Sequence, residues 1–206
     1  MIFSKPPRTP ECLAQKLISN GLQDISESKL TEIFQSVNYY KLRGYTYPYQ
    51  DNSVPNSPFL PNVKWSYIWN DYNFDLKLRT LLFSSISFIE TALKTRMTLV
   101  SLTLGATWFQ VINIVRNICA HHGRLYSRQL ITTPLFVVPQ KGCWVRAWPN
   151  PNRVYAAICI IKNFLDICNP NNAFSGELKE LMKMARTEQL PSMGFPADWE
   201  TEPLFE

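Results

Sequence analysis

Residues 65–103 read WSYIWNDYNFDLKLRTLLFSSISFIETALKTRMTLVSLT and contain neither glycine nor proline. Apolar side chains recur there every three or four positions, which is the spacing of one face of an α-helix. The pattern predicts one helix of about 38 residues, or two helices with a break near Ser84 and Ser85. Asp71, Asp75 and Arg79 are four apart and are expected to share its polar side, with Asp75 and Arg79 in a structural role.

Helical spacing extends to both sides of this stretch. Residues 11–20 indicate a short helix that ends at Gly21, and a second helix follows with Asp24 and Glu27 in a capping arrangement. Further helices are predicted over residues 107–129, 154–167 and 175–187, the last with Ser175 as its candidate cap. Prolines predict loops over residues 50–63 and 144–151. Since no segment alternates with a period of two, we expect an all-α fold.

The chain is expected to have three parts. Residues 1–63 form an N-terminal helical segment with a tyrosine-rich and a proline-rich loop, and residues 64–190 form a helical core. Residues 191–206 form an irregular acidic tail, packed on the core by its aromatic side chains. With 206 residues, of which 46% are hydrophobic, the chain can bury a core and is not mostly disordered.

Composition also bears on the localisation of the protein in the cell. No apolar run approaches the ~18 residues that a membrane span needs, and no segment sets a lysine-rich face opposite a wide apolar face, so no membrane partner is expected. The first residues show no secretion signal. The five cysteines form no CxxC pair and are odd in number, which favours reduced thiols in the cytoplasm.

The net charge of +5 hides an uneven distribution. No acidic residue occurs between Glu90 and Asp166, although nine lysines and arginines do, whereas residues 187–206 carry five acids and no base. This asymmetry favours a polyanionic partner. The pattern alone leaves nucleic acid, a membrane surface and an acidic protein open, as well as a solvated surface without a partner.

The middle of the acid-free stretch carries the residues most suited to chemistry, VRNICAHHGRLYSR over residues 115–128. On a helical wheel, one stripe holds two amides, an imidazole and two guanidiniums: Asn113, Asn117, His121, Arg124 and Arg128. His122 falls among apolar residues on the other side. We therefore expect His121 to face outward among cations and His122 to be a structural histidine in the core.

This stripe suits cleavage of RNA through the ribose 2′-hydroxyl. The nucleophile belongs to the substrate, so the reaction needs no metal or other cofactor. Nearby cations favour the neutral imidazole of His121, which can then take a proton, and Arg116 offers a planar fork of donors to a phosphate. A zinc site at Cys119, His121 and His122 is a weaker reading, because a helix would turn Cys119 and His122 inward.

Arg116-Asn117-x-x-x-His121 is similar to the RNxxxH form of the Arg–His motif of HEPN ribonucleases. The wider chain resembles the Abi (abortive infection) family of bacterial anti-phage proteins. The matching pieces are KPP (5–7), GL (21–22), NYYKLRGY (38–45), YNFDLKLR (72–79), IE (89–90), RNICAHHGRLYSR (116–128) and MGFPADW (193–199). The resemblance implies a HEPN-like helical bundle and a metal-independent, toxin-like endoribonuclease, active as a homodimer with a composite site.

The resemblance also implies roles for single residues. Arg116 would stabilise the scissile phosphate, Asn117 would orient it, and His121 would act as general acid–base. Control by a small RNA encoded nearby is implied as well. Asn113, Arg124 and Arg128 are expected to contact the RNA substrate.

The tyrosine-rich segment, residues 39–49, is a second candidate for RNA contact. Tyr40 and Arg43 would bind there by stacking on bases and by charge. Packing of the tyrosines onto the core is the alternative.

The chain departs from the family pattern at one place. Family members have several dozen further residues between the long helix and the RNxxxH helix, whereas here residues 105–110 lead directly into Val111. Either a natural deletion or a segment missing from the sequence would explain the difference. Because catalysis depends on how the site is completed, a non-catalytic RNA-binding or RNA-sensing module is the alternative function.

Overall fold

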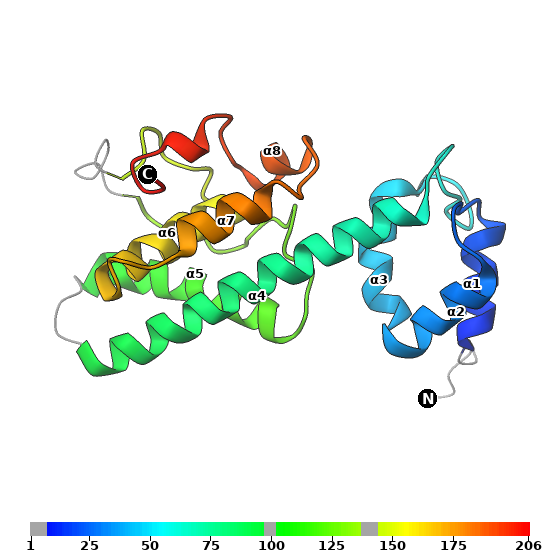
Figure 1. Ribbon diagram of the computed structural model, residues 1–206, viewed down its shortest axis with the longest axis horizontal. Coiled ribbons are helices and arrows are strands. Elements are labelled where there is room, and N and C mark those ends of the chain that lie inside the picture. The colour runs from blue at the N-terminus through cyan, green and yellow to red at the C-terminus, as the bar shows by residue number, and fades with distance from the viewer. Residues whose placement is uncertain (1–7, 97–101, 137–143) are drawn as a thin grey trace. The chain divides into compact units, whose positions relative to one another are not determined.

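The computed structural model describes residues 8–96, 102–136 and 144–206 (Figure 1). Within these ranges the regular elements are helices, and strand pairing is limited to two isolated bridges, Gln23 with Lys64 and Gln50 with Phe59. The expected all-α fold is confirmed. None of the helices in the described part of the chain combines the length and the apolarity that crossing a bilayer requires.

The chain divides into two compact units, Met1–Asn73 and Phe74–Glu206. The division lies inside the longest helix, α4, Trp65–Arg96. This helix is continuous at Ser84 and Ser85, where both hydroxyls donate to the carbonyl of Leu81. Hydroxyls that bond to their own helix leave its backbone ladder in place, so the alternative with a break near Ser84 and Ser85 is wrong. The predicted end of the helix near Thr103 is not reached within α4, because residues 97–101 lie outside the described residues and Leu102–Ala120 forms the next helix, α5.

The first unit contains α1 (Pro10–Ser19), α2 (Glu27–Ser36), α3 (Tyr39–Thr46), the short 3₁₀ helix η1 (Tyr47–Tyr49) and the start of α4. As predicted, α1 ends just before Gly21, whose φ of 97° lies in the left-handed region. The cap of α2 is Ser26, whose Oγ accepts from Lys29 N–H at 3.3 Å. The prediction of Asp24 as cap is wrong, because Asp24 has a φ of 67° rather than the extended backbone of a cap.

The second unit contains the rest of α4 with α5 (Leu102–Ala120), α6 (Val154–Cys168), α7 (Phe174–Met182), α8 (Gln189–Met193) and η3 (Trp199–Thr201). Helix α6 is central, since every residue from Val154 to Lys162 is buried. Helix α7 begins one residue before Ser175, and Asn172 Oδ1 accepts from Phe174 N–H at 3.2 Å. Ser175 is therefore not the cap.

The end of the chain covers α6 with aromatic rings. Phe195 lies 4.6 Å from Tyr155 between ring centroids, and Phe205 lies 6.0 Å from the same ring. Trp199 packs edge-on against Phe205. The tail also carries a buried carboxylate, Glu202, which accepts from Arg146 N–H at 2.6 Å.

Candidate functional site

The residues of the RNxxxH segment lie at the C-terminal end of α5. The helix ends in a Schellman motif, in which His122 N–H donates to Cys119 O at 3.0 Å and Gly123 N–H donates to Ile118 O at 2.8 Å. His122 occupies the left-handed position of the motif with a φ of 54°. Histidine is one of the few non-glycine residues enriched in that conformation.

This helix end corrects two predictions. Helix α5 covers Leu102–Ala120 and not residues 107–129, so Arg124 and Arg128 do not belong to the helical stripe. His122 is exposed and not a core histidine, because the left-handed turn takes it off the helical wheel. Its structural contribution is to end the helix.

Residues 123–128, here called the basic turn segment, are held by a buried ion pair on α4. The carboxylate of Asp75 accepts from Leu125 N–H at 3.0 Å and from Tyr126 N–H at 2.7 Å. Arg79 Nε lies 3.5 Å from Asp75 Oδ2, and Arg79 Nη1 donates to Gly123 O at 3.4 Å. The side chains of Asp75 and Arg79 are 0% and 3% exposed. Asp75 and Arg79 thus lie inside the protein and bind the backbone of the basic turn segment, which fits the structural role predicted for them.

The three motif residues themselves face solvent. Arg116, Asn117 and His121 are all exposed. His121 N–H donates to Asn117 O at 3.0 Å, which is the helical bond that places residues four apart on one side. Asn113 is exposed one turn earlier. The predicted exposed stripe is therefore confirmed for Asn113, Asn117 and His121.

The Arg116 guanidinium is engaged by two neighbours. Its Nη1 donates to Asn117 Oδ1 at 3.4 Å, and its Nε lies 3.6 Å from Glu90 Oε1 on α4. The Arg116 and Glu90 side chains are 46% and 37% exposed, so the pair is solvated and weak. Glu90 is not among the predicted site residues. The signal for it in the sequence is the resemblance of Ile89 and Glu90 to the family.

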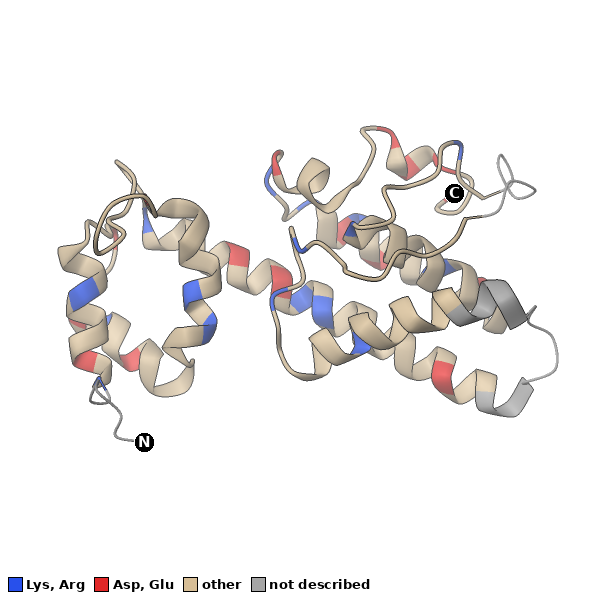
Figure 2. Cartoon of the chain, turned by 180° about the vertical axis from the view of Figure 1, so that it is seen from behind, with Lys and Arg blue, Asp and Glu red and all other residues tan. Residues whose placement is uncertain are grey.

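The two arginines of the basic turn segment lie beyond the end of the helix, and the Arg128 guanidinium lies next to Gly123. The Arg124 guanidinium carbon lies 5.4 Å from the centroid of the Tyr126 ring, a cation–π contact. Arg128 is exposed and its Nη1 reaches Arg124 O at 3.5 Å. In Figure 2 the described part of α5 and the segment after it carry Lys or Arg without Asp or Glu.

Another base of the acid-free stretch is engaged by the tail. Arg146 Nη1 donates to Thr201 Oγ1 at 2.8 Å and lies 3.7 Å from Asp198 Oδ2. The acidic tail thus contacts Arg146.

Tyr40 and Arg43 lie on α3, in the first unit, whereas the motif residues belong to the second. Tyr40 is 72% exposed and Arg43 is exposed, which leaves both side chains accessible. Tyr45 and Tyr49 of the same segment are buried, and Tyr49 Oη donates to Asp71 Oδ2 at 2.8 Å. Packing onto the core is therefore the outcome for Tyr45 and Tyr49, whereas Tyr40 keeps an accessible ring.

Cys119 lies beneath the motif and is buried. Burial, reinforced by the nearby charge of Asp75, raises the pKa of the Cys119 thiol from 9.0 to about 12. Cys119 is therefore a protonated core side chain, whereas His121 and His122 are exposed. Among the described residues, no three His, Cys, Asp or Glu side chains are grouped as a metal site would need.

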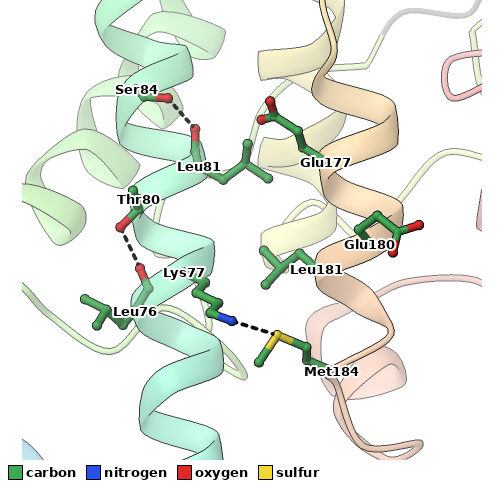
Figure 3. Close-up of a pocket in the computed structure, with 9 residues that line it drawn as sticks. All are labelled: Leu76, Lys77, Thr80, Leu81, Ser84, Glu177, Glu180, Leu181 and Met184. Atoms are coloured by element: carbon green, nitrogen blue, oxygen red, sulfur yellow. Dashed lines mark hydrogen bonds between the residues drawn. The ribbon is translucent and has the colours of Figure 1, made fainter.

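A separate groove of about 560 Å³ lies between α4 and α7 (Figure 3). It is lined by Leu76, Lys77, Thr80, Leu81, Ser84, Glu177, Glu180, Leu181 and Met184, and none of these was predicted as a site residue. Lys77 Nζ donates to Met184 Sδ at 3.3 Å across it, and Glu180 pairs with Lys183. The groove offers one lysine, engaged by Met184, beside two glutamates that would repel a phosphate. The end of α5 brings an imidazole and a guanidinium together without a glutamate on the same helix, so it is the better candidate for phosphate chemistry.

Comparison with known proteins bears on the resemblance to the Abi family. A family model described as Abi-like protein matches residues 32–109. The predicted resemblance is confirmed over this range, which includes Tyr40, Asp75 and Glu90 and ends before Arg116. No curated protein and no solved structure matches the chain.

Proposed function

We propose that this Abi family protein is a metal-independent endoribonuclease of the HEPN type that acts in bacterial abortive-infection defence against phage. One observation carries the proposal: Arg116, Asn117 and His121 are exposed together at the end of α5. An imidazole and a guanidinium on one accessible surface are the groups that transfer a proton and stabilise a phosphate in RNA cleavage.

In the proposed reaction the RNA supplies its own nucleophile. The imidazole of His121 takes the proton of the ribose 2′-hydroxyl, and the 2′-oxygen forms a bond to phosphorus. The bond from phosphorus to the 5′-oxygen breaks, and that oxygen takes a proton from an imidazolium, so the products are a 2′,3′-cyclic phosphate and a 5′-hydroxyl. Arg116 stabilises the charge that develops on the phosphate oxygens, and Asn117 orients the group.

A homodimer would complete this site. Proton uptake and proton delivery take place on opposite sides of the scissile phosphate, and the motif of one chain contributes one histidine, His121, to one of these sides. His121 of one protomer then acts as base and the partner's His121 as acid.

Arg124 and Arg128 extend the proposed RNA surface beyond the helix, because both follow α5 within eight residues of its end. Tyr40 and Arg43 offer a second contact on α3, where an exposed ring can stack on a base. A small regulatory RNA would use the same basic groups and so restrain the enzyme until infection.

The test is cleavage of RNA in the presence of EDTA by the wild-type protein, by His121→Ala and by His122→Asn. Wild type and His122→Asn should give products with 2′,3′-cyclic phosphate ends, and His121→Ala should not. His122→Asn is the matched control, because asparagine tolerates the left-handed backbone at that position. Cleavage by His121→Ala would exclude the mechanism, and loss of wild-type cleavage in EDTA would exclude metal independence.

The second candidate is a non-catalytic RNA-binding or RNA-sensing module. It is favoured by the state of the motif, since Arg116 is paired with Glu90 and the His121 imidazole forms no hydrogen bond or ion pair with the described residues. This candidate predicts salt-sensitive RNA binding without turnover. Binding without 2′,3′-cyclic products, unaffected by His121→Ala, would support it.

A further inference from the structure

The basic turn segment has no regular secondary structure of its own. It begins after His122 and contains Ser127, and both residues have left-handed backbones, with φ of 54° and 55°. Neither a helix nor a strand therefore fixes the path of residues 123–128. The path depends on tertiary contacts, and a buried backbone N–H needs a partner from somewhere in the fold.

Asp75 supplies that partner from a distant part of the sequence. Its carboxylate accepts from the consecutive N–H groups of Leu125 and Tyr126, fifty and fifty-one positions further along the chain. The Tyr126 ring packs edge-on against Phe74, next to Asp75 on α4, with 6.4 Å between centroids. Arg79 adds a bond to Gly123 O one turn later on α4. Two side chains of one helix thus hold three positions of the segment, Gly123, Leu125 and Tyr126.

The ion pair with Arg79 also limits the repulsion between the Asp75 carboxylate and a bound phosphate. A carboxylate beneath a surface of arginines would repel a phosphate if its charge were exposed or uncompensated. Asp75 is buried, and Arg79 Nε lies 3.5 Å from Oδ2, so its charge is balanced inside the protein. Asp75 and Arg79, here called the clamp, can therefore hold the basic turn segment without weakening the positive potential of its arginines.

We propose that Asp75, supported by Arg79, is a positioning residue that holds Arg124 and Arg128 where they meet RNA phosphates beside His121. This inference rests on the proposed RNA-binding function and extends it, because it assigns a role in substrate binding to a side chain that touches no substrate. The Abi-like range contains Asp75 and Arg79 but not the segment that they hold.

The test compares Asp75→Asn with Asp71→Asn. Asp71 is the matched control, because it is a buried aspartate one turn earlier on α4 that accepts from Tyr49 Oη in the first unit. Two quantities are measured on the full chain: amide hydrogen exchange along residues 121–128, and the affinity for a single-stranded RNA over a range of salt concentrations.

Asp75→Asn should raise exchange in residues 123–128 while α6 stays protected. It should lower RNA affinity about tenfold and reduce the slope of log affinity against log salt by roughly one phosphate contact or more. Asp71→Asn should leave exchange in that segment and the salt slope at wild-type values. If Asp75→Asn only destabilised the fold, amide protection would fall throughout the second unit. The molecules that remain folded would then bind RNA with the wild-type slope of log affinity against log salt.

The outcomes separate the inference from the function beneath it. Unchanged exchange in Asp75→Asn would overturn the clamp, and raised exchange with wild-type RNA binding would overturn its positioning role. Failure of the wild-type protein to bind RNA would overturn the proposed function itself. Should Asp75→Asn not fold, Arg79→Lys takes its place, because it keeps a cation beside Asp75 and removes the bond to Gly123 O. Wild-type salt dependence in a folded Arg79→Lys with raised exchange would likewise overturn the inference.

Discussion

Glu90 on α4 places a carboxylate oxygen 3.6 Å from Nε of Arg116 on α5. The arginine of the proposed site is therefore already engaged by an acid in the free protein, and a phosphate that binds there must take the place of that carboxylate. Because both side chains are well solvated, the exchange costs little.

Replacing Glu90 by glutamine should strengthen RNA binding. The change removes a charge that repels phosphate and competes for Arg116, so we expect an affinity gain of about two- to fivefold at low salt, shrinking as salt rises. Fluorescence anisotropy with a labelled RNA measures it. Glu177→Gln on α7 is the matched control, as an exposed acid in the separate groove between α4 and α7. An affinity that falls in Glu90→Gln would mean that Glu90 supports binding.

Neutralising single arginines should separate the RNA surface from the contact with the tail. Arg128 is exposed and its guanidinium lies next to Gly123, two residues after His121. Arg128→Ala should therefore weaken the binding of every RNA sequence tested and lower the slope of log affinity against log salt by roughly one contact. Arg146 is engaged by Thr201 and Asp198, so Arg146→Ala should leave that slope unchanged. Equal losses of RNA affinity in the two variants would mean that RNA also contacts the surface around Arg146 and the tail.

The helix end at His122 should be sensitive to side-chain shape. A β-branched residue is strained at a φ of 54°, so His122→Val should lower the free energy of unfolding by about 1–2 kcal/mol. His122→Asn should stay close to wild type. Denaturant unfolding measures both variants, and a wild-type stability for His122→Val would show that the chain avoids the left-handed turn at low cost.

The burial of Cys119 should be visible in its reactivity. Because burial raises the pKa of this thiol to about 12, its thiolate is scarce at pH 8, and iodoacetamide should modify it far more slowly than the exposed Cys12. Mass spectrometry of peptides from the native protein measures the two rates. Modification at the rate of Cys12 would contradict the buried position of Cys119.

The same shift affects stability in alkali. The pKa is raised in the folded state, so this contribution is intact below the unfolded value of 9.0 and is lost as pH rises toward about 12. Over that window the unfolded chain releases the Cys119 proton and the folded chain keeps it. The loss should be smaller in Cys119→Ala, measured as unfolding free energy against pH.

Much of the helical framework follows from local sequence. The run without glycine or proline predicted α4, and Gly21 predicted the end of α1, because a helical ladder and a left-handed turn depend on residues close to one another. The exposure of Asn113, Asn117 and His121 also followed from spacing alone, since these residues lie on or just beyond the part of α5 that is helical.

The end of α5 was decided by the tertiary structure. Local spacing allowed the helix to continue to residue 129, although Gly123 and the tolerance of histidine for the left-handed region also allowed it to end at His122. The alternative became favourable because Asp75 and Arg79, more than forty residues earlier, bind the backbone of the following segment. The sequence by itself therefore determined the all-α class, the run of α4 and the motif. Only the fold decided where the motif helix stops, which acid faces Arg116 and how the arginines beyond the helix are held, because these depend on hydrogen bonds and charges between residues far apart in the chain.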